Sequence, residues 1–210
     1  MLVIHDGATA GGAVRIRPLR RAEFEYLVRG GAFDADEVEL LHGALVELGA
    51  ADPWHDEAVA EAAMRLRRQL GAAATVRVHQ SLPLGEYSAP SPDITVATAV
   101  THWTGLRART LVVIEVAGAT RDKDRGPKRQ LYAGAAIDEY WLIDLEAGCI
   151  EVFAARDPAL GVWGTATVYR RGEVAQHGSV PALTLGIDDL IALPWRHDLR
   201  PDAGAAKPDA

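Results

Sequence analysis

The stretch LVVIEVAGATRDKDRGPKRQLYAG, residues 111–134, sets the plan of this chain. Its first six residues are almost all apolar and rich in β-branched side chains, which predicts a strand covered on both faces of a sheet. The segment that follows, 121–134, predicts a helix that is capped by Thr120 or Asp124, accommodates Pro127 in its first turn and ends at Gly134. We therefore expect a buried strand followed directly by a helix.

One charged residue, Glu115, interrupts the predicted buried strand. A carboxylate in that position needs a cation, a metal or strong hydrogen-bond donors nearby, because isolation in a low-dielectric interior would raise its pKa and neutralise it. Asp93 lies 22 positions earlier (115 − 93), directly before a second predicted strand, 94–98, that could be a neighbour in the sheet. Lys128 lies on the predicted helix, on the side that it shares with Tyr132.

These three residue types match the needs of metal-assisted phosphodiester hydrolysis. Hard cations such as Mg²⁺ bind carboxylate oxygens and water, and a side-chain cation beside the attacking water or scissile phosphate completes such a site. Segment 121–129 adds five basic residues against two acidic ones, a local charge of +3. It predicts either a phosphate-facing patch or a solvated helix face with ion pairs such as Asp124 and Lys128.

The composition narrows the classes of function. The chain has 210 residues, 49% of them hydrophobic, and its 22 Lys and Arg against 29 Asp and Glu make a formal charge of −7. This is typical of one soluble globular domain, and the negative charge means that nucleic acid must bind to a local basic patch. With Cys149 as the single cysteine, an intramolecular disulfide and a cysteine-based zinc site are excluded. A free thiol, without a signal-peptide core or a membrane-length apolar run, predicts a cytoplasmic protein with no membrane association.

Two residues upstream of Asp93 have competing interpretations. The pattern there predicts a loosely ordered leader at 1–18, a helix at 19–28, a hairpin about His42-Gly43 at 38–49, a helix at 52–71 and a strand at 75–78. Glu39 lies on the first hairpin strand, where the residues alone favour a solvent-facing carboxylate on an edge strand. His55 begins the buried stripe of the long helix, where a histidine hydrogen-bonded at the edge of the core is favoured over a metal ligand.

The downstream part of the chain completes the expected domain. Its pattern predicts strands at 139–145, 150–155 and 163–173 and a short helix at 185–193. The last segment, 196–210, lacks apolar content and predicts a disordered tail. We therefore expect a single domain over 19–195.

The order of these motifs resembles a known family. The succession of VELLHGALVE, His55, SPD at 91–93, LVVIEV, GATRDKDRGPKRQLYAG and IDEYWLID is similar to the Uma-type family of predicted restriction-endonuclease-like proteins, within the PD-(D/E)xK nuclease superfamily. The resemblance spans roughly residues 20–193. It implies an α/β fold with a restriction-endonuclease-like core, in which helices flank a central mixed β-sheet. It also maps the family's site onto four residues: Glu39, Asp93, Glu115 and Lys128.

Two departures from the family pattern lie just after Glu115. In the simplest superfamily pattern the lysine lies two positions after the second acid, where this chain has Ala117. The lysine must then come from the following helix, as Lys128. The family's usual Ser-Pro-Ser-Thr reads Ala-Gly-Ala-Thr at 117–120, which removes a proline and two hydroxyl groups from the loop that leads to this helix.

The resemblance implies a Mg²⁺-dependent DNA endonuclease. Asp93 and Glu115 would bind Mg²⁺ (or Mn²⁺), Lys128 would stabilise the attacking water or the phosphate, and Glu39 would position a second metal or water. The alternative is a non-catalytic nuclease-like domain that binds a protein or nucleic-acid partner, with the acids kept as a structural network; the acidic total charge favours it slightly. A third, weaker interpretation is a hydrolase of another phosphate ester. A homodimer is compatible with each of them.

Overall fold

The computed structural model describes residues 17–33, 38–49, 53–99, 108–117 and 124–191. Nearly all of the expected leader and the whole expected tail, 196–210, lie outside these described residues. Within the described part, no helix is long and apolar enough to cross a membrane.

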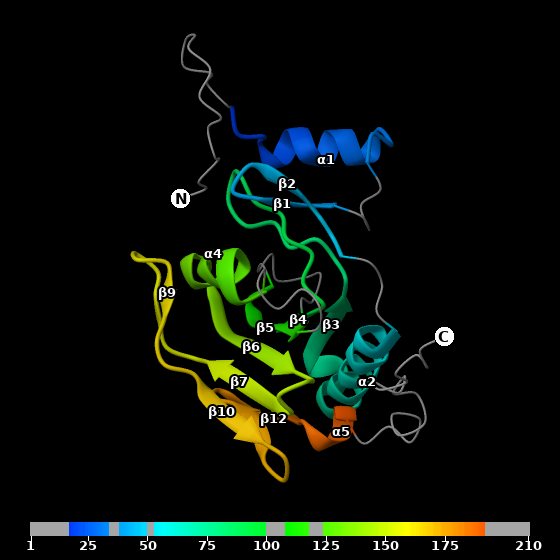
Figure 1. Cartoon of the computed structure of the whole chain (residues 1–210), viewed down its shortest axis with the longest axis vertical. Coiled ribbons are helices and arrows are strands. Elements are labelled where there is room, and N and C mark those ends of the chain that lie inside the picture. Colours follow the sequence, from blue (N-terminus) through cyan, green and yellow to red (C-terminus); the bar gives the residue numbers. More distant parts are fainter. Residues whose placement is uncertain (1–16, 34–37, 50–52, 100–107, 118–123, 192–210) are drawn as a thin grey trace, which may run out of the picture.

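A mixed six-stranded sheet forms the centre of the molecule, as the resemblance implies (Figure 1). Its strands in spatial order are β10 (Thr167–Arg170), β7 (Cys149–Phe153), β6 (Ile137–Asp144), β5 (Thr110–Ala117), β4 (Ile94–Thr98) and β3 (Ala74–Val78). β5 and β6 are parallel, and the other neighbouring pairs are antiparallel. All but the first residue of β5 are buried, which confirms the strand predicted from the unbroken apolar run.

Helices cover both faces of this sheet. One face packs against α2 (Pro53–Leu70), the hairpin of β11 (Val174–His177) and β12 (Val180–Gly186), and the short α5 (Asp188–Ile191). The other face packs against α4 (Arg129–Gly134), which lies on the opposite side of the sheet from α2 in Figure 1. Side chains of β5 alternate between the two layers, so Ile114 contributes to the α2 core and Val113 to the α4 core.

A third, smaller layer lies beyond one end of the sheet (Figure 1). It contains α1 (Arg21–Arg29) and the hairpin of β1 (Val38–Leu41) and β2 (Ala44–Glu47), with a small core of Phe24, Leu40 and Ala89. The predicted turn at His42-Gly43 is present: both residues have positive φ, 51° and 83°, which is typical of a two-residue type I′ hairpin. A side chain at position 43 would also collide with Pro18, so glycine is required there.

The C-terminal third departs most from the sequence-based prediction. The strand predicted at 163–173 is limited to β10, with β9 (Val162–Trp163) forming a separate short pair with β8 (Arg156–Asp157). The helix predicted at 185–193 is wrong over its start, where β12 continues to Gly186 before the single turn of α5. Pairing explains the difference, because Leu185 lies opposite Ala175 of β11 and long-range strand pairing overrides the local helical pattern.

A buried glutamate fastens the β11–β12 hairpin to the sheet. Glu139 of β6 accepts one hydrogen bond from Trp141 Nε1 at 2.7 Å and another from the backbone N–H of Gly178 at 2.8 Å. Glu139→Ala is therefore expected to lower the free energy of unfolding by about 2–3 kcal/mol, because the buried indole N–H of Trp141 loses its acceptor. Chemical denaturation measures this change. Glu57→Ala, at an exposed position of α2, is the control and should change stability by less than about 0.5 kcal/mol.

Candidate active site

Strand pairing brings Asp93 and Glu115 together. Ile94 lies opposite Ile114 in the antiparallel β4–β5 pair, so the residue before β4 faces Glu115 across the ladder. The backbone N–H of Asp93 donates to Glu115 Oε2 at 3.3 Å, and the backbone N–H of Val116 donates to Asp93 Oδ2 at 2.7 Å. Each carboxylate thus accepts a hydrogen bond from a backbone N–H of the opposite segment.

Lys128 reaches both buried glutamates from the segment after β5. Residues Asp124–Lys128 form a wide π-helical turn that contains Pro127, and α4 begins directly after it. The Lys128 Nζ atom lies 3.3 Å from Glu115 Oε1 and 3.4 Å from Glu39 Oε2, with 6% of its side chain exposed. Lys128 therefore contacts two of the other three residues named by the resemblance, Glu39 and Glu115, and Asp93 is joined to them through its backbone N–H bond to Glu115.

Glu39 is buried, which corrects the solvent-facing position favoured by the residues alone. Its side chain is 1% exposed, because segment 84–90 and α1 pack against a strand that would otherwise form an open edge. Its Oε2 atom accepts a hydrogen bond from the backbone N–H of Ser91 at 3.0 Å. Its Oε1 atom is buried and has no hydrogen-bond partner among the described residues. Such an oxygen is costly to bury unless a bound cation or water satisfies it.

Tyr132 of α4 fixes the orientation of Glu115. Its hydroxyl donates to Glu115 Oε1 at 2.6 Å, and its side chain is fully buried. Burial, and then the nearby negative charge of Glu115, raise the pKa of the Tyr132 hydroxyl well above its usual value, so it remains a donor. The sequence indicated Tyr132 as an anchor of the helix; the structure adds this contact with the carboxylate.

Two histidines flank Asp93 on its more exposed side. His55 Nε2 lies 3.0 Å from Asp93 Oδ2, and His55 Nδ1 lies 3.2 Å from Asp56 Oδ1. His79 Nε2 lies 3.6 Å from Asp93 Oδ1, and the two imidazole rings stack with centroids 6.2 Å apart. Sequence reasoning missed His79. The signal that identifies it is the β3–β4 register, because Val78 pairs with Ile94 and the next residue therefore lies beside Asp93.

The His55–Asp93 pair shifts both pKa values. Burial lowers the pKa of His55, but the hydrogen bond and charge of Asp93, with a smaller contribution from Asp56, raise it to about 9. Burial opposes ionisation of Asp93, yet its hydrogen bonds to His55 and His79 and the backbone N–H of Val116 hold the pKa of its carboxyl well below the usual value. Without metal, the pair is therefore ionic at neutral pH.

This pair predicts how the stability of the metal-free protein depends on pH. The raised pKa of His55 adds stability that is complete below its unfolded value of 6.5 and is lost as the pH rises through about 9. The lowered pKa of Asp93 adds stability that is present above 3.8 and is lost at lower pH. We expect a stability maximum between about pH 4 and 6.5, measured by chemical denaturation in the presence of a chelator.

The substitution His55→Gln tests whether His55 causes the loss of stability at alkaline pH. In His55→Gln the decline in stability between pH 7 and 9 should largely disappear, because the group that loses its proton is absent. The exposed His42, in the β1–β2 turn, provides the matched control, and His42→Gln should keep the parent's profile. A parent and a His55→Gln variant with parallel profiles would contradict the assignment.

The carboxylate cluster fits a hard divalent cation. Glu39 and Glu115 with Lys128 amount to two carboxylates and one ammonium, a formal charge of −1 in a buried site, before Asp93 is added. The unpartnered Glu39 Oε1 atom supplies a further oxygen donor. Oxygen donors with net negative charge are what Mg²⁺ and Mn²⁺ bind. Glu39 and Glu115 are therefore the residues of the buried cluster that could hold such an ion, with Asp93 beside Glu115 on the neighbouring strand.

The predicted basic patch at 121–129 is described only in part. Lys128 is committed to the buried ion pairs, and the Arg129 guanidinium lies 4.7 Å from the ring centroid of Phe153. Lys128 is therefore a buried cation and not part of a solvated basic face. The other basic side chains of the patch, and the expected pair between Asp124 and Lys128, lie outside the described residues and side chains.

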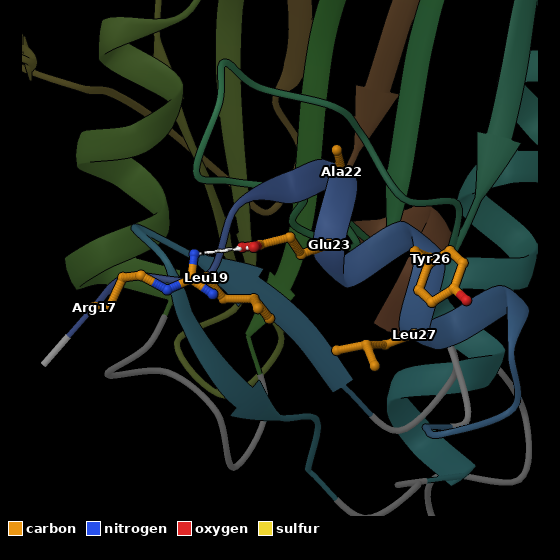
Figure 2. Close-up of a pocket in the computed structure, with 6 residues that line it drawn as sticks. All are labelled: Arg17, Leu19, Ala22, Glu23, Tyr26 and Leu27. Carbon is orange, nitrogen blue, oxygen red and sulfur yellow. Dashed lines mark hydrogen bonds and ion pairs between the residues drawn. The ribbon is translucent and has the colours of Figure 1, made fainter.

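A surface depression of about 400 Å³ lies along α1, apart from the carboxylates (Figure 2). An ion pair between Arg17 and Glu23 crosses it, and the phenol ring of Tyr26 stands at its other end. Its lining residues are Arg17, Leu19, Ala22, Glu23, Tyr26 and Leu27. It contains none of the residues of the buried cluster.

Comparison with known proteins places this geometry in context. A family model, Uma2, described as "Putative restriction endonuclease", matches residues 22–188. The chain is also similar to a crystal structure described as "a putative nuclease belonging to DUF820" from Anabaena variabilis, with a TM-score of 0.64 and 16% sequence identity. That similarity covers 83% of this chain and 98% of the other, and at this identity it shows a shared fold. No curated protein matches the chain.

Proposed function

This chain belongs to the Uma2 family of restriction-endonuclease-like proteins, and from that premise we propose that it is a Mg²⁺-dependent DNA endonuclease. The observation that carries the proposal is the buried Lys128 in contact with Glu39 and Glu115, with the backbone N–H of Asp93 bonded to Glu115. A buried net negative charge of this kind serves no packing purpose, whereas it suits a site that binds a cation and a phosphodiester.

Each residue of the cluster has a distinct part in this proposal. Asp93 and Glu115 would hold Mg²⁺ (or Mn²⁺), and Glu39 would hold a further ion or water through its unpartnered oxygen. The bound ion would supply Lewis acidity and a more acidic water. Tyr132 keeps the Glu115 carboxylate turned toward Lys128 through its hydrogen bond. Lys128 provides a fixed positive charge where negative charge develops on the phosphate.

Exposure indicates the side from which substrate would approach. The side chain of Asp93 is 13% exposed, whereas those of Glu39 and Glu115 are 1% exposed. Among the described residues, His55 and His79 both lie next to the Asp93 carboxylate. A phosphate would therefore meet Asp93 before the two buried glutamates.

We further propose that residues 19–195 fold as a single domain. The contact between Glu39 and Lys128 joins the layer of α1 and the hairpin to the central sheet, so the two layers share a buried ion pair. One cooperative unfolding transition is expected, with coincident curves from fluorescence and circular dichroism.

Cleavage of supercoiled plasmid DNA tests the proposed activity. The protein should nick or linearise the plasmid in Mg²⁺, should be inactive with a chelator, and should lose activity in Asp93→Asn, which preserves side-chain shape but weakens metal binding. A parent protein that binds no Mg²⁺ in calorimetry and cleaves neither DNA nor RNA would instead support the non-catalytic alternative. In that case the cluster of Glu39, Glu115 and Lys128 would be a structural network.

A further inference from the structure

We propose that His55, His79 and Asp93 form a second metal site, which selects imidazole-binding divalent ions such as Zn²⁺. The residues alone favoured His55 as a histidine at the edge of the core, and the structure adds His79 beside it. One ligand atom from each of the three residues lies within 4.8 Å of the other two. The site shares Asp93 with the proposed catalytic cluster, but it does not require that the chain cleave DNA.

The distances between the donor atoms suit a small ion. His55 Nε2 and Asp93 Oδ2 are 3.0 Å apart, and His79 Nε2 and Asp93 Oδ1 are 3.6 Å apart. Ligands that lie about 2.0–2.2 Å from a tetrahedral ion are separated from one another by roughly 3.3–3.6 Å. Small side-chain rotations would therefore bring all three donors onto one ion, and water would complete its shell.

His55 is oriented as a metal ligand usually is. Its Nδ1 atom lies 3.2 Å from Asp56 Oδ1, and its Nε2 atom is directed toward Asp93. Histidine ligands commonly donate their second ring N–H to a carboxylate, which fixes the ring and makes the ligating nitrogen more basic. Asp56 would provide this carboxylate. With 19% of its side chain exposed, His55 has little freedom to turn away.

His79 is brought to the site by an uncommon backbone conformation. It follows the last residue of β3 with φ of 48°, in the left-handed region that few non-glycine residues adopt. Its backbone N–H donates to the carbonyl oxygen of Asp93 at 3.1 Å, which places its side chain beside that residue. Its ring is 47% exposed, so it can rotate toward an ion and an ion can reach it from solvent.

The chemistry of the donors separates this site from the carboxylate cluster. Glu39 and Glu115 offer oxygen atoms in a buried position, which suits Mg²⁺. Two imidazole nitrogens and one carboxylate suit Zn²⁺, Co²⁺ or Ni²⁺, whereas imidazole is a poor ligand for Mg²⁺. Because Asp93 belongs to both sets, an ion held by the two histidines would withdraw it from Mg²⁺. The histidine site would therefore reduce Mg²⁺ affinity when it is filled.

Titration calorimetry with Zn²⁺ on chelator-stripped protein tests the site. The parent should bind Zn²⁺, and His55→Gln and His79→Asn should each weaken binding at least tenfold. Asparagine tolerates the left-handed conformation of position 79, so this variant removes the ligand without straining the backbone. His42→Asn is the matched control, since His42 is also exposed and left-handed (φ 51°) but lies in the β1–β2 turn, and it should bind Zn²⁺ as the parent does.

X-ray absorption and the variant Glu115→Gln test the histidine site independently of the proposed DNA cleavage. The zinc spectrum should show imidazole scattering, and Glu115→Gln should keep Zn²⁺ affinity within about threefold while it loses Mg²⁺ binding. A protein that binds Zn²⁺ in this way but never cleaves DNA would leave the histidine site standing and overturn the nuclease. Zn²⁺ affinity that is unchanged in His79→Asn, or a spectrum without imidazole, would overturn the histidine site alone.

Discussion

Under the proposed activity, Lys128→Ala should lower the rate of DNA cleavage by about 10²–10³-fold while Mg²⁺ binding persists, because the proposal assigns the lysine to developing charge and not to the metal. Its ammonium group lies between Glu39 and Glu115 and contacts both carboxylates. Removal of a point charge from a buried site cannot be compensated by water that does not enter it. Cleavage rates at saturating Mg²⁺, together with calorimetry of Mg²⁺ binding, measure the two effects separately.

The same substitution should also destabilise the protein. Without Lys128, the buried carboxylates of Glu39 and Glu115 lose their shared cation, and removal of one member of a buried ion pair costs about 3–5 kcal/mol. Lys128→Arg tests whether charge alone suffices. It should recover much of the stability but little of the rate, because a planar guanidinium cannot occupy the point of a compact ammonium. A Lys128→Ala protein that is stable and cleaves within threefold of the parent would remove Lys128 from the site.

Asp93→Ala and Glu115→Ala should abolish cleavage by a different route, the loss of metal. Each removes an oxygen donor, so Mg²⁺ affinity should fall at least about 100-fold and cleavage should become undetectable. Calorimetry of Mg²⁺ or Mn²⁺ binding, in parallel with plasmid cleavage, measures both losses. The contrast with Lys128→Ala is the essential result, because one class of variant loses the ion and the other keeps it.

A buried glutamate elsewhere in the sheet is the matched control for these variants. Glu139 is 5% exposed and lies on the neighbouring strand β6, where it binds Trp141 and Gly178. Glu139→Gln keeps one acceptor oxygen and should leave Mg²⁺ affinity and cleavage within about twofold of the parent. Equal losses of Mg²⁺ affinity in Glu139→Gln and Glu115→Ala would mean that the effect reflects stability and would contradict a specific role for Glu115.

Local sequence patterns were sufficient for the parts of this fold that depend on burial alone. The apolar run of β5 predicts a strand covered on both faces, and Asp93, directly before β4, faces Glu115 of β5 once the two strands pair. The place of Lys128 beside Glu115 was implied by the family resemblance and not by a local pattern, which indicated only that Lys128 and Tyr132 share a side of the helix.

Local sequence patterns did not predict the environment of residues that contact distant segments of the chain. Glu39 has the pattern of an outward-facing edge carboxylate, but the backbone of Ala89 pairs with Leu40 and covers the strand. His79 follows an ordinary short strand, and only the β3–β4 register reveals its contact with Asp93. The segment at Leu185 has a helical pattern that pairing with β11 overrides. In each case the deciding partner is remote in sequence or follows from strand pairing, which periodicity does not report.

The ion pair between Glu39 and Lys128 also determines when the site can exist during folding. It closes a loop of 89 residues (128 − 39), so it forms only after β3, β4 and β5 have assembled between its ends. A chain growing from the ribosome exposes all three carboxylates before their lysine has been synthesised. Until then the acids lack their cation, and the turn Asp124–Lys128 must dock to bring it to them. Chains that end before Lys128 should therefore carry the acidic residues of the site without their neutralising cation.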